Sequence, residues 1–429
     1  MNSKKALIIT YYWPPAGGPG VQRWLKFVKY LPEFGIEPIV YCPENPSYPI
    51  MDESLLSEIP ESITILKQPI CEPYGLARLF SKGSAKKISS GVIPKAKKQS
   101  FIEKAMLYIR GNYFIPDARK NWVKPSVTFL SNYIKDNEIT TIITTSPPHS
   151  LHLIGLHLKE KLNVNWLADF RDPWTTIGYH KALKLTQSSK AKHRDLELTV
   201  LNTADEIIVT SNHTKTEFET KTKQPISVIT NGYDAHIVGA EEKDELFTLS
   251  HIGSLLSERN PTVLWETLSE LINGNDEFSK VFQLNLVGVV SDDVIESINK
   301  YGLKTHLNVE GYVAHDEALK FQMKSQVLLL IEIDSEDTKA IIPGKIFEYL
   351  ISETPILAMG PIDSDIEQII KSTNTGAYFN YKQKEELKTQ ILSYFEAFKN
   401  KTLKVNAIGL QPYSRKALTK KLSTIINKK

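Results

Sequence analysis

The sequence predicts an α/β protein with two doubly wound parallel-sheet domains, and three observations lead to this prediction. The chain has 429 residues, more than a single hydrophobic core usually serves. Short apolar runs alternate with stretches of helical spacing, as they do when helices cover both faces of a parallel sheet. A charged run at 239–245 interrupts this alternation, which then starts again.

The first half of the chain predicts one complete domain, residues 1–238. Residues 6–12 form an apolar strand, and 20–31 carry apolar side chains at helical spacing, closed by Pro32 and Gly35. The same rhythm predicts helices at 123–134 and 150–161 and strands at 36–41, 63–66, 140–145, 164–168, 206–210 and 226–229.

The second half predicts another domain of the same class, residues 239–404. Its strands are expected at 247–252, 282–287, 307–309, 327–331 and 355–358, with helices at 261–271 and 317–323. The tail at 413–426 has one apolar helical stripe, so we expect a C-terminal helix within 405–429 that packs back on the first domain. Two such domains predict a ligand cleft between the carboxyl ends of their sheets.

Composition excludes several classes of protein. The chain is 41% hydrophobic and 24% charged, which is ordinary for a globular protein, and its net charge of +3 accompanies no nucleic-acid-binding motif. The chain contains no run of about 18 apolar residues, so we expect no transmembrane helix, and no signal peptide is recognised. Cys42 and Cys71 lack metal-site spacing and fit a reducing cytoplasm. We therefore expect a cytoplasmic protein that binds no nucleic acid.

The segment from Ser81 to Arg110 is strongly basic, with apolar and aromatic residues interleaved. Its only acid is Glu103, and its bases are Lys82, Lys86, Lys87, Lys95, Lys97, Lys98, Lys104 and Arg110. Such a segment can sit on an anionic membrane surface, which predicts a peripheral protein on the inner face of the plasma membrane. A solvated loop and helix is the open alternative.

The first polar clusters follow predicted strands, where doubly wound sheets bind ligands. Gly17 and Gly18, after the first strand, let a ligand approach backbone amides at a helix start. NAD binding with Glu44 as ribose acceptor stays open, although the pattern is not G-x-G-x-x-G. His149, after a later strand, is either a proton acceptor or a helix cap.

Another cluster, Asp169, Arg171, Asp172 and Trp174, follows the next strand. Two carboxylates flank an arginine, and the tryptophan offers a flat face of the kind on which sugars stack. The alternative is a structural Asp–Arg pair, which applies more to Asp169 than to Asp172. We expect this cluster to contact a bound sugar.

In the second domain, Gly253 follows a strand and Arg259 comes six residues later. A glycine turn followed by a cation suits a diphosphate. Val313, after another strand, lies where backbone groups could meet a base edge.

The turn Pro343-Gly344 opens a helix on which Lys345 and Glu348 share one face. A phosphate near the start of this helix, with a carboxylate one turn away for two sugar hydroxyls, suits a nucleotide sugar. The alternative is a buried amphipathic helix with an ordinary Lys–Glu pair.

These residues, in this order, resemble the GT-B glycosyltransferases, in particular the large retaining family called family 4. The likeness covers nearly the whole chain. It implies transfer of a sugar from a nucleoside diphosphate donor, with no metal or cofactor at the reacting centre. It also implies that the second domain binds the donor and the first the acceptor, with Gly17, Gly18, Asp169, Arg171 and Trp174 as the acceptor-binding residues. The matching motifs are Gly17-Gly18, the run 169–174, Asn231-Gly232-Tyr233-Asp234, Gly253 with Arg259, and the run 343–349.

The resemblance also assigns roles to single residues. Gly253 and Arg259 match the diphosphate-binding turn and cation, and Glu348 matches the second glutamate, which accepts the ribose hydroxyls. Ala340 stands where the family has its first glutamate, which contacts the transferred sugar. Glu336 and Asp337 are the candidates to replace it, and Lys345 is the candidate for the second cation.

We therefore expect a metal-independent, hexosyltransferase-type enzyme of cell-surface polysaccharide or glycolipid synthesis, acting on a glycan or lipid-linked acceptor. Arg259, Lys345 and Gly344 would neutralise the leaving diphosphate, and Asp172 or His149 would be the general base if configuration inverts. Two rival functions stay open. One is a nucleotide-sugar epimerase or hydrolase on the same fold, and the other is a non-catalytic partner protein of this fold.

Overall fold

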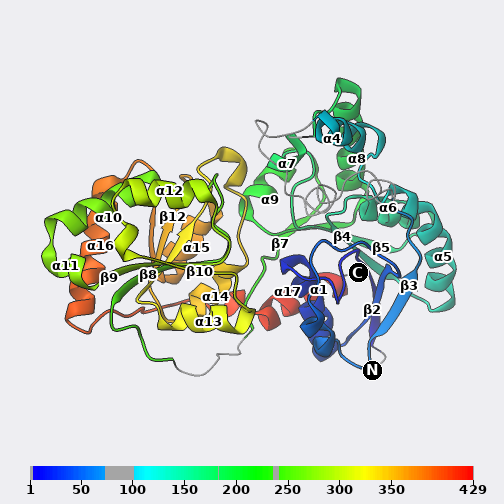
Figure 1. The fold of residues 1–429 in the computed structure, drawn as a ribbon. Helices are drawn as coiled ribbons and strands as arrows, with labels where there is room; N and C mark the ends of the chain where they lie inside the picture. Colours follow the sequence, from blue (N-terminus) through cyan, green and yellow to red (C-terminus); the bar gives the residue numbers. More distant parts are fainter. Residues whose placement is uncertain (1–2, 73–100, 182, 235–240, 429) are drawn as a thin grey trace. The chain divides into compact units, whose positions relative to one another are not determined.

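The computed structural model describes residues 3–72, 101–181, 183–234 and 241–428. The chain divides into two compact units (Figure 1). Unit 1 comprises Met1–Thr230 and Arg415–Lys429, and unit 2 comprises Asn231–Ser414. The boundaries expected from the sequence were 238 and 405, against 230 and 414 in the structure.

Unit 1 contains a seven-stranded sheet in the order β3-β2-β1-β4-β5-β6-β7. Every neighbouring pair of strands is parallel, which confirms the predicted sheet type. The strands are β1 (Lys4–Ile9), β2 (Ile36–Pro43), β3 (Thr64–Gln68), β4 (Thr141–Ser146), β5 (Asn165–Phe170), β6 (Glu206–Val209) and β7 (Ile226–Val228).

Helices cover both faces of this sheet. They are α1 (Pro19–Tyr30), α4 (Phe101–Tyr113), α5 (Val123–Asp136), α6 (Ser150–Leu162), α7 (Gly178–Lys181), α8 (Gln187–Thr203), α9 (Asn212–Glu219) and α17 (Arg415–Asn427). Alternate side chains of β1 point to opposite faces. Leu7 and Ile9 join the core under α5, α6 and α8, whereas Ala6 and Ile8 join the core under α1 and α17.

The C-terminal helix α17 packs against α1 and the short 3₁₀ helix η1 (Leu31–Phe34), as the sequence predicted (Figure 1). Its apolar stripe of Leu418, Leu422 and Ile426 is buried in the core shared with α1. The last residues of the chain therefore complete one face of unit 1.

Unit 2 contains a six-stranded parallel sheet in the order β10-β9-β8-β11-β12-β13. The strands are β8 (Phe247–Ile252), β9 (Phe282–Val287), β10 (Leu307–Gly311), β11 (Val327–Ile331), β12 (Ile356–Met359) and β13 (Gly376–Phe379). The central strands are buried along their whole length. The sequences of β11 and β12 are accordingly apolar throughout, whereas β8 also buries Thr248, Ser250 and His251.

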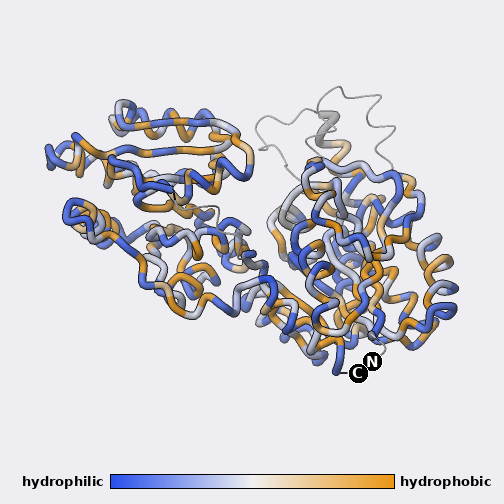
Figure 2. Tube along the Cα trace, turned by 90° about the horizontal axis from the view of Figure 1, so that it is seen from below, coloured by the Kyte–Doolittle hydropathy of each residue, from blue (hydrophilic) through white to orange (hydrophobic). Residues whose placement is uncertain are grey.

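The helices of unit 2 also lie on both faces. They are α10 (Thr262–Gly274), α11 (Asp276–Val281), α12 (Asp292–Lys300), α13 (His315–Lys324), α14 (Lys345–Ile351), α15 (Asp365–Thr373) and α16 (Lys384–Lys399). Leu329 and Leu357 pack under α10, α12 and α16, and Leu328 and Ile356 pack under α14 and α15. Figure 2 shows polar and apolar residues alternating along the helices, as expected where one side faces a core. None of the described helices is long and apolar enough to cross a lipid bilayer.

Candidate functional site

In unit 2, the glycine turn after β8 brings backbone close to a lysine. Gly253 has a φ of +115°, which favours glycine, and a Cβ there would lie 3.5 Å from the Nζ atom of Lys345. Gly288, after the neighbouring strand β9, has a φ of +128°, and a Cβ there would lie 2.5 Å from the carbonyl oxygen of Gly253. Both positions therefore require glycine, one for its conformation and the other for space as well.

Lys345 is the first residue of α14, and its side chain points to the end of β8. Its Nζ atom lies 3.1 Å from Nε2 of His251 and 3.2 Å from the carbonyl oxygen of Ile252. Burial and the charge of Arg259 lower the pKa of Lys345 to about 8, although Glu332 and Glu348 oppose the shift. The pKa of His251 is well below its usual value because that ring is buried and faces Lys345. Lys345 is therefore the charged member of this pair near neutral pH.

Arg259 faces Glu332, the first residue after β11. An Nη2 atom of Arg259 lies 3.3 Å from Oε2 of Glu332. The Glu332 side chain is 2% exposed, and within the described chain its Oε1 atom and the Nε atom of Arg259 have no hydrogen-bond partner. Burial raises the pKa of Glu332, although Arg259 and Lys345 oppose the rise. This polar cluster is thus incompletely bonded without a ligand.

The sequence missed Glu332 as a site residue. The strand-end rule that selected Gly253 also applies to it, because it follows the apolar run of β11 directly. The candidates named instead, Glu336 and Asp337, lie in the exposed 3₁₀ helix η6 (Glu336–Thr338). The Glu336 side chain is 84% exposed and pairs with Lys339 at 2.9 Å.

Glu348 lies on α14 with its carboxylate partly exposed. Its Oε2 atom accepts a hydrogen bond of 2.9 Å from Gln322, and its Oε1 atom lies 3.8 Å from Nε2 of His315. Gly344 caps the start of α14, and Val313 packs against the same apolar cluster as Phe347. The predicted donor residues of unit 2 therefore follow the ends of β8 and β10 or belong to one short helix, and Glu332 joins them from the end of β11.

In unit 1, Asp169 is fully buried, and both of its carboxylate oxygens accept hydrogen bonds. It accepts hydrogen bonds of 2.8 Å each from Arg23, Trp24 and Thr145. Burial alone would raise its pKa, but the Arg23 charge and these bonds hold the pKa of Asp169 below its usual value. The structural alternative thus holds for Asp169, and the expectation that its carboxylate contacts an acceptor is corrected.

Asp172, after the end of β5, differs from Asp169. It is half-buried and has no hydrogen bond or ion pair within the described parts of the chain. Burial raises the pKa of Asp172, with Arg171 opposing and Asp169 adding to the rise. A carboxylate with a raised pKa and an open side is suited to accept a proton.

Arg171 holds the start of this loop in place. Its Nε and Nη2 atoms donate hydrogen bonds of 2.9 and 2.8 Å to the carbonyl oxygens of Ser146 and Pro147. Its guanidinium also lies on Gly20, where a Cβ would fall 1.4 Å from Nη1. The charge of Arg171 thus lies between the end of β4 and the start of α1. Gly17 and Gly18 directly precede this helix in the sequence. Gly18, with a φ of +104°, caps α1 and has open space beside it.

Trp174 and His149 stack on each other. Their ring centroids are 4.7 Å apart at an angle of 6°, and Trp174 donates a hydrogen bond of 3.1 Å to Nδ1 of His193. Trp174 is completely buried, so the expectation that a sugar stacks on its face is wrong. His149 lies at the cap position of α6, and burial with three neighbouring histidines keeps its pKa well below the usual value. The neutral His149 is mainly a packing partner of Trp174.

The basic segment lies mostly outside the described residues. The lysines at positions 82, 86, 87, 95, 97 and 98 belong to the part that is not described. The last part of the segment lies in helix α4, which exposes Tyr108, Ile109 and, just beyond the segment, Tyr113 to solvent.

No protein-family model matches the sequence, and no curated protein matches it. Solved structures do resemble the fold. HepE of Anabaena, solved with UDP and glucose, superposes with a TM-score of 0.60 at 13% identity, covering 100% of both chains. WaaB, a lipopolysaccharide outer core galactosyltransferase, gives 0.56 at 14% identity, covering 99% of both. A putative UDP-N-acetylglucosamine 2-epimerase from Listeria monocytogenes gives 0.52 at 13% identity, covering 99% of this chain and 96% of that one. The chain therefore has the two-domain GT-B fold.

Proposed function

We propose that the protein is a glycosyltransferase that moves a sugar from a nucleoside diphosphate donor to a glycan or lipid-linked acceptor. The observation that carries the proposal is the pair of cations Arg259 and Lys345 at the Gly253 turn, beside the incompletely bonded Glu332. The whole-length likeness to HepE, which was solved with UDP and glucose, supports it. Cell-surface polysaccharide or glycolipid synthesis is the proposed setting, in line with WaaB.

In this proposal unit 2 binds the donor. Arg259, Lys345 and the amide of Gly344 bind the diphosphate beside the Gly253 turn, because guanidinium, ammonium and N–H groups are its natural partners. Glu348 accepts the ribose hydroxyls, and the backbone near Val313 meets the base. As the sugar leaves, negative charge grows on the diphosphate, and the two cations stabilise it without assistance from a metal ion.

Glu332 takes the place of the glutamate that Ala340 replaces. It is buried between the two cations, and its Oε1 atom has no partner in the described chain. Such an oxygen is available to a hydroxyl of the transferred sugar. This assignment makes Glu332 a specificity residue for the sugar.

Unit 1 is the proposed acceptor unit, with Gly17, Gly18 and Arg171 near the bound acceptor. Asp172 is the general base if configuration inverts, since its raised pKa and open side favour proton uptake. We place the enzyme in the cytoplasm, peripheral on the inner face of the plasma membrane through the basic segment.

The test is incubation with a panel of nucleotide sugars and measurement of nucleoside diphosphate release, with and without a chelator. Wild type should release it from one donor, and Arg259→Ala should lose most of this activity. Lys371→Gln, which removes an exposed charge on α15, is the matched control. Release from no donor would refute the proposal and favour the non-catalytic partner protein, and loss in the chelator would refute metal independence.

The second candidate is an epimerase or hydrolase of nucleotide sugars. The likeness to the Listeria structure favours it. An epimerase would change the configuration of the donor sugar with no acceptor present and no change in donor mass. Nuclear magnetic resonance of the donor distinguishes this outcome from transfer.

A further inference from the structure

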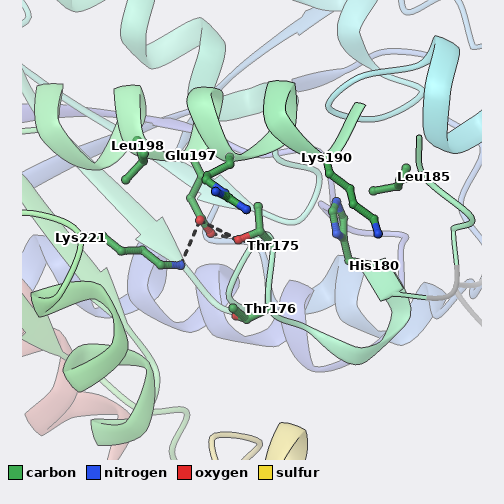
Figure 3. A pocket seen from close by; sticks show the side chains of 9 residues that line it. Thr175, Thr176, His180, Leu185, Lys190, Glu197, Leu198 and Lys221 are labelled. Carbon is green, nitrogen blue, oxygen red and sulfur yellow. Dashed lines mark hydrogen bonds and ion pairs between the residues drawn. The ribbon is translucent and has the colours of Figure 1, made fainter. Parts of the chain in front are cut away.

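A pocket lies wholly within unit 1, between the loop after β5 and helix α8. Its volume is about 490 Å³. Thr175, His180 and Glu197 line it together with the cations Lys190, Arg194 and Lys221 (Figure 3). None of these residues belongs to the diphosphate cluster of unit 2.

One wall of the pocket is rigid and electrically balanced. The buried Glu197 accepts hydrogen bonds from the backbone N–H of Thr175 at 3.1 Å and from its hydroxyl at 2.7 Å. The Nζ atom of Lys221 lies 3.0 Å from Glu197 (Figure 3). It also lies 2.6 Å from Glu217. Burial alone would lower the pKa of Lys221, but these two carboxylates raise it above its usual value. The charge of Lys221 is therefore already compensated.

The other wall carries two cations without compensation. Lys190 and Arg194 are four residues apart on α8, so their side chains share one face of the helix. Neither forms an ion pair or side-chain hydrogen bond within the ranges that the structure describes. Like charges at this spacing repel each other, and an anion bound between them would relieve the repulsion.

His180 adds an unpartnered buried group. The residue is 8% exposed, and its Nε2 atom has no hydrogen-bond partner among the described residues. Its ring packs edge-on against His193, with centroids 4.5 Å apart, which fixes its direction. Burial and His193 lower the pKa of His180 to about 4, so it is a neutral hydrogen-bonding group.

We propose that this pocket binds a phosphomonoester on the acceptor, with Lys190 and Arg194 on the phosphate oxygens and Nε2 of His180 on the ester or an adjoining hydroxyl. The inference rests on the proposed function and names its acceptor class. Two uncompensated cations match a dianion better than a carboxylate. Leu185 and Leu198 line the same pocket and suit an apolar group beside the phosphate. The phosphate belongs either to a sugar or to a polyprenyl alcohol.

The test is calorimetric titration of the full chain with inorganic phosphate, glucose 1-phosphate and farnesyl phosphate. One of the two esters should bind at least tenfold more tightly than inorganic phosphate, and the tighter ester identifies the source of the phosphate. Lys190→Gln and Arg194→Gln should each weaken that binding about tenfold, as for a lost charge-assisted hydrogen bond. Lys192→Gln, an exposed lysine of α8 outside the pocket, is the matched control and should bind like wild type.

His180→Phe tests the third contact, because it keeps the ring packing and removes the nitrogen. It should weaken ester binding while its melting temperature stays close to that of wild type. Equal binding of all three probes, no binding, or equal losses in Lys192→Gln and Arg194→Gln would overturn the pocket proposal.

Nucleotide-sugar turnover by wild type separates this proposal from the proposed function. If a donor releases its nucleoside diphosphate but neither ester binds, the pocket proposal fails and the proposed function is not affected. If an ester binds but no donor is turned over, the glycosyltransferase fails, and the assignment of the ester as an acceptor fails with it.

Discussion

At the scale of single residues, Glu332 is the group whose surroundings satisfy it least. It is buried against Arg259, yet one carboxylate oxygen has no partner in the described chain. An anionic diphosphate would compete with this carboxylate for Arg259. Under the proposed function, Glu332 would therefore oppose binding of a nucleotide that carries no sugar and would offer its free oxygen to the sugar of the donor.

This competition predicts opposite effects of Glu332→Gln on two measurements. Affinity for the nucleoside diphosphate alone should rise about fivefold, or ~1 kcal/mol, because Arg259 loses an anionic neighbour. Sugar transfer should slow. Glu336→Gln, in the exposed η6, is the control and should change neither. A lower nucleotide affinity in Glu332→Gln would mean that the carboxylate organises the cations instead of competing for them.

Lys345 predicts how nucleotide binding depends on pH. Its pKa of about 8 in the free protein means that the ammonium is charged below that pH and available to phosphate. A bound phosphate raises this pKa, so above pH 8 binding must take up a proton and affinity falls by up to about tenfold per pH unit. Titration between about pH 7.5 and 9.5 measures the slope. Lys345→Arg should remove it, and a slope that persists in this variant would assign the effect to another group.

Asp172→Asn should slow transfer by about 10² to 10⁴ while donor affinity changes little, because the amide cannot accept the acceptor's proton. Initial rates and donor titrations separate the two effects. Asp195→Asn, an exposed change on α8, serves as the comparison. If Asp172→Asn transfers sugar at the rate of wild type, Asp172 acts neither as the general base nor as a ligand of the acceptor.

At the scale of elements, Asp169 ties β5 to α1 and β4. Its carboxylate bonds Arg23 and Trp24 of α1 and Thr145 of β4, all inside the unit. These partners are distant in sequence, so the motif alone did not reveal them. The same reason explains Trp174, whose face is covered by a histidine from another loop.

Asp169→Asn should therefore destabilise unit 1 by about 3–5 kcal/mol, the usual cost of leaving a buried charge unpaired. The pKa of Asp169 is depressed in the folded state, so its stabilisation is present above the unfolded pKa of about 3.9 and disappears as pH falls through the folded value. Chemical denaturation at neutral pH measures the loss. Asp136→Asn, exposed at the end of α5, should cost little. An equal effect of the two changes would show that the Asp169–Arg23 pair adds no stability.

The sequence predicted strands better than polar helices. The predicted bounds of β8, β9 and β11 matched the structure residue for residue. β11 is apolar throughout, as is typical of a strand buried on both faces, whereas β8 and β9 begin with apolar residues at alternate positions. Helix α8 was not predicted, since its buried positions include His193 and Glu197 and leave only a faint apolar stripe. The first strand was predicted to reach residue 12 but ends at Ile9. The apolar pattern continues beyond the strand because Tyr11 and Trp13, in the loop that follows, are also buried.

At the scale of the whole molecule, the basic segment predicts attachment to anionic lipid. Each base near such a surface contributes about 1 kcal/mol, screened by salt. The protein should cosediment with anionic vesicles at low salt and leave them at high salt. Replacing Lys86, Lys87, Lys97 and Lys98 with Gln should weaken binding without lowering the melting temperature.

A matched control replaces four exposed lysines of unit 2, Lys300, Lys304, Lys371 and Lys401, with Gln. It removes the same total charge from another region. If wild type stays in the supernatant at low salt, the prediction of membrane attachment is wrong, and the alternative of a solvated loop is favoured.

The return of α17 to unit 1 has a consequence for the order of folding during synthesis. Unit 2 is continuous in sequence, so it can fold as soon as residue 414 has left the ribosome, whereas one face of unit 1 stays uncovered until α17 follows. Until then, Trp24, Leu25 and Val28 of α1 lack their apolar cover from α17. A nascent chain that stalls before residue 415 would thus present this face to chaperones and proteases, although most of unit 1 and all of unit 2 had already been made.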